Sequence, residues 1–289
     1  MIRVLASGPL ATTQDLGRWG WGHLGVPRSG PADPPSHHLA NRLVGNAIHA
    51  ATVEVLRGGL TVEFLEPALL AITGAPVGAC LDGVPVAFGA TVWAPAGTVL
   101  SLTVPRFGLW SYLAARGGFD LEPQLGSRSA DTLSGIGPPP LAPGQVVPIG
   151  DLVAGPPAAT DSLIGLSDRR DIEMRVSPGP RHEWFTRQAQ ELLVTTAWTL
   201  SADTNRIAAR LTGPELTLVE PRQLPTEGLQ IGSIQVPPSG QPIVHLANHP
   251  PTGGYPVIAV VDESDLPMLA QSLPGTVVRL VRRAPGRPA

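Results

Sequence analysis

The segment TTQDLGRWGWGHLGVPRSGPAD (12–33) carries an amide, a carboxylate and a guanidinium close together, in Gln14, Asp15 and Arg18. Neighbouring glycines allow the backbone to approach a ligand, and the three side chains offer specific polar contacts. The segment is therefore a candidate binding loop. An alternative interpretation is a hydrogen-bonded connection in which Asp15 and Arg18 pair only with each other.

A second polar segment, AARGGFDLEPQLGSRSADTL (114–133), combines Ser127 and Arg128 with flexible backbone. Hydroxyl, guanidinium and free N–H groups together bind carboxylate or phosphate, so this segment is a candidate anion site. The alternative is a turn-rich loop with surface ion pairs.

The second half of the chain offers three more polar stretches. In TNRIAARL (204–211), Arg206 and Arg210 lie on one face whether the stretch is helix or strand. Glu227 could act as a general base, and the Thr252-Gly253-Gly254 turn could form an oxyanion or phosphate nest. The histidines lack metal-ligand spacing and are interpreted as surface or loop residues.

These residues must be positioned by short strands. The 33 Gly, 33 Pro and only 15% charged residues, with apolar runs between turn signals, predict a mostly β protein with a few short helices. Helices are expected over HHLANRLVG (37–45), HEWFTRQAQELL (182–193) and DLPMLAQSL (265–273). Asp33 with two prolines would begin the first helix, and Ser264 would cap the third.

Pro- and Gly-rich stretches near the middle of the chain predict two domains, residues 1–160 and 161–289. A spacing repeats between them, because Gly97 precedes Tyr112 by the same interval as Gly240 precedes Tyr255. Such echoes favour two related β-domains.

Several classes of function are disfavoured by composition. A net charge of −3 without an early basic block argues against nucleic-acid binding, and no apolar run reaches the ~18 residues of a membrane span. Without a signal peptide, the protein is expected in the cytoplasm. Cys80 is expected in the core. All 20 basic residues are arginine, so no lysine can carry biotin, lipoyl or a Schiff base within this sequence.

Taken together, the polar segments resemble the carboxyltransferase-domain family called allophanate hydrolase subunit 2, or KipA-type proteins, which includes the C subunit of bacterial 5-oxoprolinase. The resemblance covers nearly the whole chain and rests on five motifs in the family's order: TTQDLGRWGWGHLGVPRSGPAD, LANRLVGN, GSRSAD, EGLQIGSIQVPPSGQPIV and TGGYPVIAVV. It implies two cyclophilin-like β-barrel domains.

The resemblance also implies a role in a complex. The chain would act with a KipI-type (allophanate hydrolase subunit 1) protein and a third 5-oxoprolinase subunit to open 5-oxoproline to glutamate. The complex would use ATP with Mg and be inactive without its partners. The sequence leaves open whether ATP binds this chain or a partner.

Opening a stable amide needs anion-binding arginines and polarising amide or N–H groups. We therefore take Glu227, Arg128 and Arg206 as candidate catalytic residues. The candidate substrate-binding residues are Gln14, Asp15, Arg18, Asp33, Asn41, Ser127, Asn205, Arg210, Gln235, Gly253, Gly254 and Tyr255.

Three other functions remain open at this point. The chain could be the carboxyltransferase half of a urea or allophanate system, with biotin carried on a partner. It could be a non-enzymatic regulator that binds a KipI-type partner without turnover. It could also be a free-standing module that binds a small ligand unaided.

Overall fold

The computed structural model describes residues 1–158, 168–220 and 223–283. The protein is mostly β, as predicted, and divides into two compact units. Unit 1 comprises Met1–Trp19 and Ser29–Asp168, and unit 2 comprises Gly20–Arg28 and Arg169–Ala289. The polar segment 12–33 is thus shared between the units. The predicted boundary between residues 160 and 161 lies outside the described residues.

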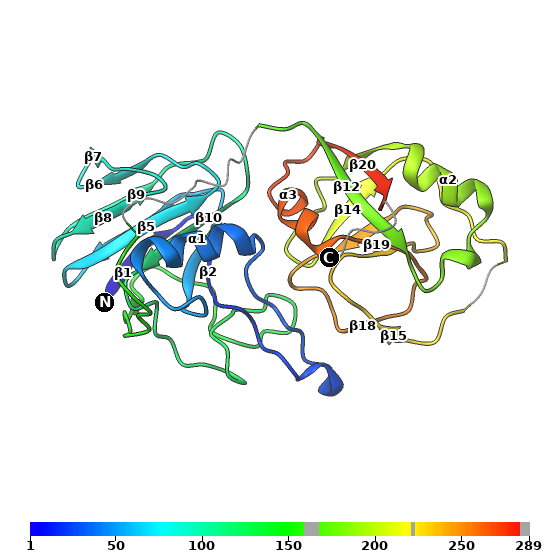
Figure 1. Cartoon of the computed structure of the whole chain (residues 1–289). Helices are drawn as coiled ribbons and strands as arrows, with labels where there is room; N and C mark the ends of the chain where they lie inside the picture. The colour runs from blue at the N-terminus through cyan, green and yellow to red at the C-terminus, as the bar shows by residue number, and fades with distance from the viewer. Residues whose placement is uncertain (159–167, 221–222, 284–289) are drawn as a thin grey trace. The chain divides into compact units, whose positions relative to one another are not determined.

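Unit 1 is built from two sheets, one of six strands and one of five (Figure 1). The first has the order β11 (Val146–Val147), β1 (Ile2–Ser7), β4 (Leu60–Phe64), β9 (Val99–Leu102), β6 (Ala79–Leu81), β7 (Val84–Pro85). The second has the order β2 (Leu10–Gln14), β3 (Thr52–Leu56), β10 (Trp110–Ala115), β5 (Ala68–Gly74), β8 (Thr91–Ala94).

The core of unit 1 follows from the alternation along its strands. In β4, Leu60, Val62 and Phe64 are fully buried while the residues between them are half-exposed. They share one apolar cluster with Leu70 and Leu113 of the other sheet. Each such side chain contributes about 1.5–3 kcal/mol when it leaves water. The two sheets therefore enclose a common core.

The helix α1 (Pro34–Val44) confirms the predicted start and end signals. The Asp33 carboxylate accepts hydrogen bonds from the Ser36 backbone N–H at 3.2 Å and from its hydroxyl at 2.6 Å. Gly45 ends the helix with φ 71°, a left-handed conformation that glycine adopts without strain. The buried face of α1 packs against β5 and β10.

Unit 2 contains a closed barrel of seven strands. Its order is β12 (Asp171–Pro178), β19 (Val257–Val261), β16 (Ser233–Gln235), β17 (Ile243–His245), β14 (Ala208–Thr212), β13 (Ala197–Leu200), β20 (Val277–Arg282). A separate two-stranded sheet joins β15 (Glu227–Gly228) and β18 (Thr252–Gly253). The short 3₁₀ helices are η1 (Gly22–Leu24), η2 (His182–Trp184) and η3 (Glu263–Asp265).

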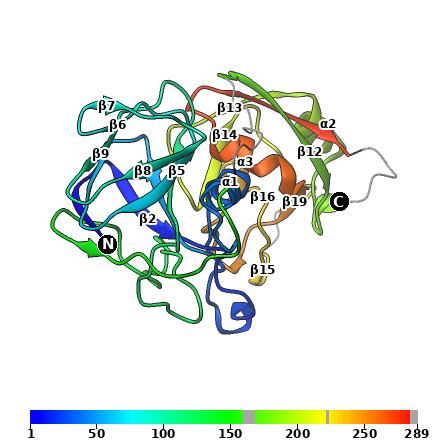
Figure 2. The ribbon, with the colours of Figure 1, turned by 60° about the vertical axis from the view of Figure 1, so that its left-hand side comes forward.

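The interior of unit 2 is filled by alternate residues of β12, with Ile172, Met174 and Val176 buried, and by Trp198. The helix α2 (Arg187–Thr195) begins after Thr186, whose hydroxyl accepts a hydrogen bond from Ala189 N at 3.1 Å. Figures 1 and 2 show α2 beside β20.

Two local predictions are wrong. Ser264 does not cap the third helix, α3 (Leu266–Ala270), because Asp262 accepts the Ser264 N–H and begins η3 instead. Cys80 is half-buried rather than in the core, because on β6 its neighbour Ala79 takes the inward position.

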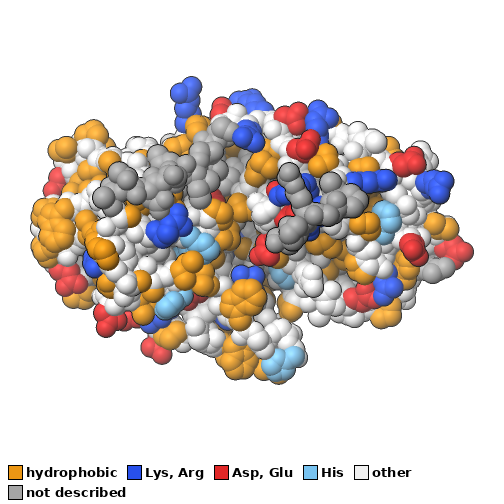
Figure 3. All heavy atoms as spheres, in the orientation of Figure 1, with side chains coloured by type: hydrophobic (Ala, Val, Ile, Leu, Met, Phe, Trp, Pro, Cys, Tyr) orange, Lys and Arg blue, Asp and Glu red, His pale blue; other side chains and the backbone are white. Residues whose placement is uncertain are grey.

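Two further properties of the described residues are the distribution of charge on the surface and the hydropathy of the helices. On the face drawn in Figure 3, acidic and basic side chains are interspersed. Over the described residues, the structure contains no helix with the length and apolar character needed to cross a membrane.

Candidate functional site

In unit 1, the end of β2 meets the loop 127–131 around the carboxylate of Asp15; we call Gln14, Asp15, Arg18, Ser127 and Ser129 the Asp15 cluster. This carboxylate is buried and accepts hydrogen bonds from the hydroxyls of Ser127 at 2.5 Å and Ser129 at 2.7 Å. It also accepts the backbone N–H groups of residues 128 at 2.6 Å and 17 at 2.9 Å. The first two polar motifs of the sequence therefore form one hydrogen-bonded centre.

Arg18 lies in the same centre and is only 2% exposed. One guanidinium nitrogen donates to the Ser129 carbonyl, whereas Nε and Nη1 are buried without a hydrogen-bond partner. Burial lowers the pKa of Arg18, and the nearby carboxylates of Asp131 and Asp15 oppose that shift. Unpaired buried donors are costly, so these nitrogens are the groups of the cluster most able to bind a further acceptor.

Close backbone approach makes this arrangement possible. A Cβ on Gly137, which has φ 97°, would overlap the Ser129 carbonyl oxygen and lie 2.8 Å from Nη2 of Arg18. Gln14 completes the centre by donating to the Ala130 carbonyl at 3.1 Å, and its own side-chain oxygen is buried without a partner.

Next to α1, a buried carboxylate has partners that the sequence did not reveal. Glu54 of β3 lies opposite Tyr112 of β10, and its carboxylate accepts the tyrosine hydroxyl at 2.7 Å and the Ala32 N–H at 2.8 Å. Burial raises the pKa of Tyr112 well above its usual value, with Asp33 adding to the rise. Asp33 thus caps the helix and borders this network.

Two other predicted residues of unit 1 have structural contacts. Asn41 donates to the Ala50 carbonyl at 2.8 Å and accepts from Asn46 at 3.0 Å, which ties α1 to the following loop. Arg128 forms an ion pair with Asp120, and its Nε is buried without a hydrogen-bond partner.

Unit 2 contains a second set of buried polar residues, Gln235 of β16, His245 of β17, Arg206 just before β14 and Asn248 just after β17, which we call the His245 cluster. His245 Nε2 is 2.8 Å from Gln235 Oε1, and the Gln235 amide donates to the Tyr255 carbonyl at 2.9 Å. That second bond fixes the amide orientation. His245 Nε2 therefore carries the hydrogen, and Nδ1, buried without a partner, keeps its lone pair.

Burial governs the charges of the His245 cluster. It lowers the pKa of His245 to about 4, with His249 adding to the shift, so the imidazole is neutral at pH 7. It lowers the pKa of Arg206 to about 9, which leaves the guanidinium charged. Arg206 donates to Asn248 Oδ1 at 2.9 Å, and Nδ2 of Asn248 is buried without a partner.

The glycines of TGGYP act differently from the prediction. Thr252 and Gly253 form a strand rather than a turn. A Cβ on Gly253 would lie 2.6 Å from Nε2 of Gln235, whereas one on Gly254 would meet nothing within 4 Å. The Tyr255 ring is 46% exposed and contributes through its backbone carbonyl.

Glu227 stands opposite Gly253 in this small sheet. Its carboxylate forms an ion pair with Arg181, which also lies 5.0 Å above the Trp184 ring. A general base in this position would first have to leave its arginine partner.

One prediction around Arg206 is wrong, and the contacts of Asn205 are local. Arg206 and Arg210 do not share a face, because Arg206 is buried before β14 begins and Arg210 is exposed on that strand. Asn205 is exposed, and its side chain accepts the N–H groups of Ile207 at 2.8 Å and Ala208 at 3.3 Å, so it stabilises a turn.

Sequence reasoning also placed His245 at the surface or in a loop, whereas it is buried on β17. The available signal was its place inside the apolar run PIVHLA, where a lone polar residue needs an internal partner. For metal binding, no group of three or more His, Cys, Asp or Glu side chains with suitable placement occurs within the described ranges.

The comparisons with known proteins agree with this architecture. Residues 24–282 match the family model "Carboxyltransferase domain, subdomain A and B", and the chain belongs to this family. It is 36% identical to the 5-oxoprolinase C subunit of Escherichia coli over 285 residues, covering 98% of this chain and 91% of that protein. The Haemophilus influenzae protein of the same name is 35% identical, with 96% and 90% covered.

Solved structures of larger enzymes contain the same fold. The Kluyveromyces lactis urea amidolyase matches with a TM-score of 0.92 and 28% identity over 98% of this chain. The urea carboxylase of that organism gives the same TM-score and identity. This chain spans 19% of the urea amidolyase chain and 27% of the urea carboxylase chain.

Proposed function

We propose that this protein is the C subunit of an ATP-dependent 5-oxoprolinase, which opens 5-oxoproline to glutamate together with partner subunits. The observation that carries the proposal is the match along nearly the full length of both proteins, 98% of this chain and 91% of the Escherichia coli protein. Urea amidolyase of Saccharomyces cerevisiae, in contrast, is matched over only 16% of its length.

The His245 cluster supplies groups that this chemistry needs. Hydrolysis of an activated amide develops negative charge on oxygen, and a fixed cation that is shielded from water stabilises such charge strongly. Arg206 is charged and only 3% exposed. In the proposed reaction it stabilises that charge, while Nδ1 of His245 accepts a hydrogen bond from an N–H or O–H group.

Burial also explains why the chain would need partners. Nδ1 of His245 and Nδ2 of Asn248 are shielded from solvent in this chain alone. A substrate reaches them only if the segments that cover them move, and we expect the KipI-type partner to cause that movement. ATP with Mg is used by the assembled complex, and ATP-derived phosphate would activate the amide.

A second candidate function is the carboxyltransferase component of a biotin-dependent urea or allophanate system. The TM-score of 0.92 to urea carboxylase favours it. Because this sequence has no lysine, biotin would have to be carried on another chain or domain.

The test is 5-oxoproline-dependent ATP hydrolysis and glutamate release, measured with this chain alone, with its partner subunits, and with the partners alone. We expect activity only in the complete mixture. A complete mixture that forms a stable complex yet hydrolyses no ATP would contradict the proposal. Transfer of the carboxyl group from added N-carboxybiotin to urea by that mixture, with release of biotin, would establish the second candidate instead.

A further inference from the structure

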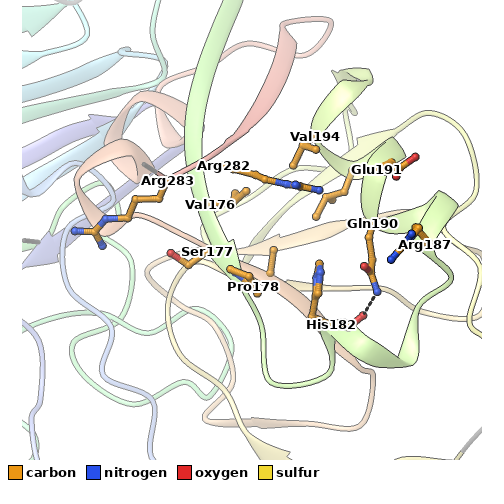
Figure 4. A pocket seen from close by; sticks show the side chains of 12 residues that line it. Val176, Ser177, Pro178, His182, Arg187, Gln190, Glu191, Val194, Arg282 and Arg283 are labelled. Carbon is orange, nitrogen blue, oxygen red and sulfur yellow. Dashed lines mark hydrogen bonds between the residues drawn. The ribbon is translucent and has the colours of Figure 1, made fainter. Parts of the chain in front are cut away.

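A pocket of about 560 Å³ lies in unit 2, beside the helix α2. Its walls are α2, the end of β12 and the end of β20 (Figure 4). None of the four residues of the His245 cluster lines it. Its volume lies in the range of small-molecule sites, which is about 300–1,000 Å³.

The lining of this pocket is strongly basic. It contains Arg187, Arg282 and Arg283 but only one carboxylate, Glu191. Arg283 has a counter-charge in Asp262 at 3.8 Å. Among the contacts of the described residues, the guanidinium groups of Arg187 and Arg282 have neither a hydrogen bond nor an ion pair. The arginines outnumber the one carboxylate, Glu191, and give the pocket a positive potential that favours an anion.

The two arginines come from different elements. Arg282 is the last residue of β20, and Arg187 is the first residue of α2. A cation at a helix N-terminus is unfavourable, because that end of the helix already carries partial positive charge. An anion bound there would be attracted by both the arginine and the helix.

His182 adds a directional group. Its Nδ1 lies 3.1 Å from the Ile258 carbonyl, which can only accept, so Nδ1 carries the hydrogen and Nε2 keeps a lone pair. In Figure 4 the ring stands between Pro178 and Gln190. The Gln190 amide nitrogen donates to the His182 and Phe185 carbonyls at 3.0 Å, which leaves its side-chain oxygen as an acceptor.

Apolar side chains complete the site. Val176 and Ala259 of the barrel and Val194 of α2 line the same pocket. A bound molecule would therefore meet cations, hydrogen-bond acceptors and an apolar surface together, a combination typical of sites for small organic molecules.

We propose that this pocket binds a small organic anion. Its carboxylate or phosphate contacts Arg187 and Arg282, its N–H or O–H group donates to Nε2 of His182, and its carbon skeleton lies against the apolar wall. The proposal does not depend on the 5-oxoprolinase activity, because it concerns binding to this chain alone at residues outside the His245 cluster.

The experiment is isothermal titration calorimetry of the purified full-length chain with four probes: inorganic phosphate, 5-oxoproline, glutamate and ADP. We expect saturable one-to-one binding of at least one organic probe with a Kd of about 1 mM or tighter. Arg282→Gln and Arg187→Gln should each weaken it about tenfold or more, because each removes a charge-assisted contact. Arg106→Gln, an exposed arginine of unit 1, should leave the Kd unchanged.

The probes separate the sources of the anion. Binding of 5-oxoproline or glutamate identifies a carboxylate site, and binding of ADP identifies a phosphate site. Equal weakening by all three arginine substitutions, or no binding of any organic probe, would overturn the proposal. Circular dichroism of each variant shows whether it is folded, and the separate activity assay of the complex leaves the proposed function to be judged on its own.

Discussion

Each of the two buried clusters contains an arginine, but the two arginines have different surroundings. In the Asp15 cluster, Arg18 lies near two carboxylates, and one of them accepts four hydrogen bonds. In the His245 cluster, Arg206 donates to a neutral amide, Asn248. Charged neighbours oppose the lowering of the pKa in Arg18, whereas burial governs the pKa of Arg206.

This difference suggests a division of roles. A compensated cluster with many internal hydrogen bonds fixes two loops against each other. A buried cation that is shielded from water, such as Arg206, stabilises an incoming negative charge strongly. We therefore expect the Asp15 cluster to matter most for stability and the His245 cluster for activity.

The largest expected effect is on stability in unit 1. Asp15→Ala leaves two buried hydroxyls and the Arg128 N–H without their acceptor, and should lower the free energy of unfolding by about 3–5 kcal/mol. Asn248→Ala in the other cluster should cost about 1–3 kcal/mol. Urea unfolding measures both, with the exposed Glu122→Gln as control. If Asp15→Ala and Asn248→Ala lowered the free energy of unfolding equally, the expected difference between the two clusters would be wrong.

The next prediction concerns pH. His245 has a pKa of about 4 in the folded protein, against about 6.5 when unfolded, so the unfolded state binds the proton first as pH falls. The contribution of the neutral His245 to the free energy of unfolding is fully present above about pH 6.5. It declines by about 3 kcal/mol as the pH falls to about 4. Calorimetric melting of His245→Gln should show a weaker loss of stability over this window. An unchanged pH profile would contradict the assignment, and exposed His23→Gln is the control.

A third prediction tests the role of Arg206 in activity. In the assembled complex, Arg206→Gln should reduce 5-oxoproline-dependent ATP hydrolysis about 100-fold, the loss typical of removing one charge-stabilising group. Arg279→Gln is the matched control, because Arg279 is exposed on β20 and pairs with Asp171 at 3.2 Å. If the folded Arg206 variant kept full activity, the charge-stabilising role would be wrong.

The smallest effect should come from a single methyl group. Gly253→Ala would place a Cβ 2.6 Å from the Gln235 amide and should lower stability by about 1–3 kcal/mol. Gly254→Ala meets open space and should leave the melting temperature within about 1 °C. A comparison of the two melting curves isolates the contact from the loss of a glycine. Identical shifts in melting temperature would mean that the Gln235 side chain moves away from the added methyl group at little cost in free energy.

The sequence predicted the parts of the fold that depend on local signals. The carboxylate of Asp33 and the φ 71° of Gly45 bound α1 as the capping rules require. At η3, two candidate caps lay close together in sequence, and only the backbone path selected Asp262 over Ser264. Local patterns therefore located elements but did not choose between neighbouring polar residues.

Contacts between residues that are distant in sequence were harder to predict. The sequence shows that the motifs around residues 15 and 127 are both polar. Whether the two motifs contact each other depends on how the strands between them pair, which the sequence does not show. Tyr112 and Glu54 pair only because β10 lies beside β3. Strand alternation could not predict that His245 is buried, because the adjacent residues Val244 and His245 are both buried in β17.

The sequence by itself determined the β-rich class, the family and the residue types of both clusters, because composition, capping signals and motifs are local properties of the chain. The tertiary structure decided which of those residues are buried together, that two carboxylates lie near Arg18, and that Arg210 and Asn205 lie outside the His245 cluster. Burial and pairing depend on strands that are distant in sequence, and these set the pKa values of His245 and Arg206.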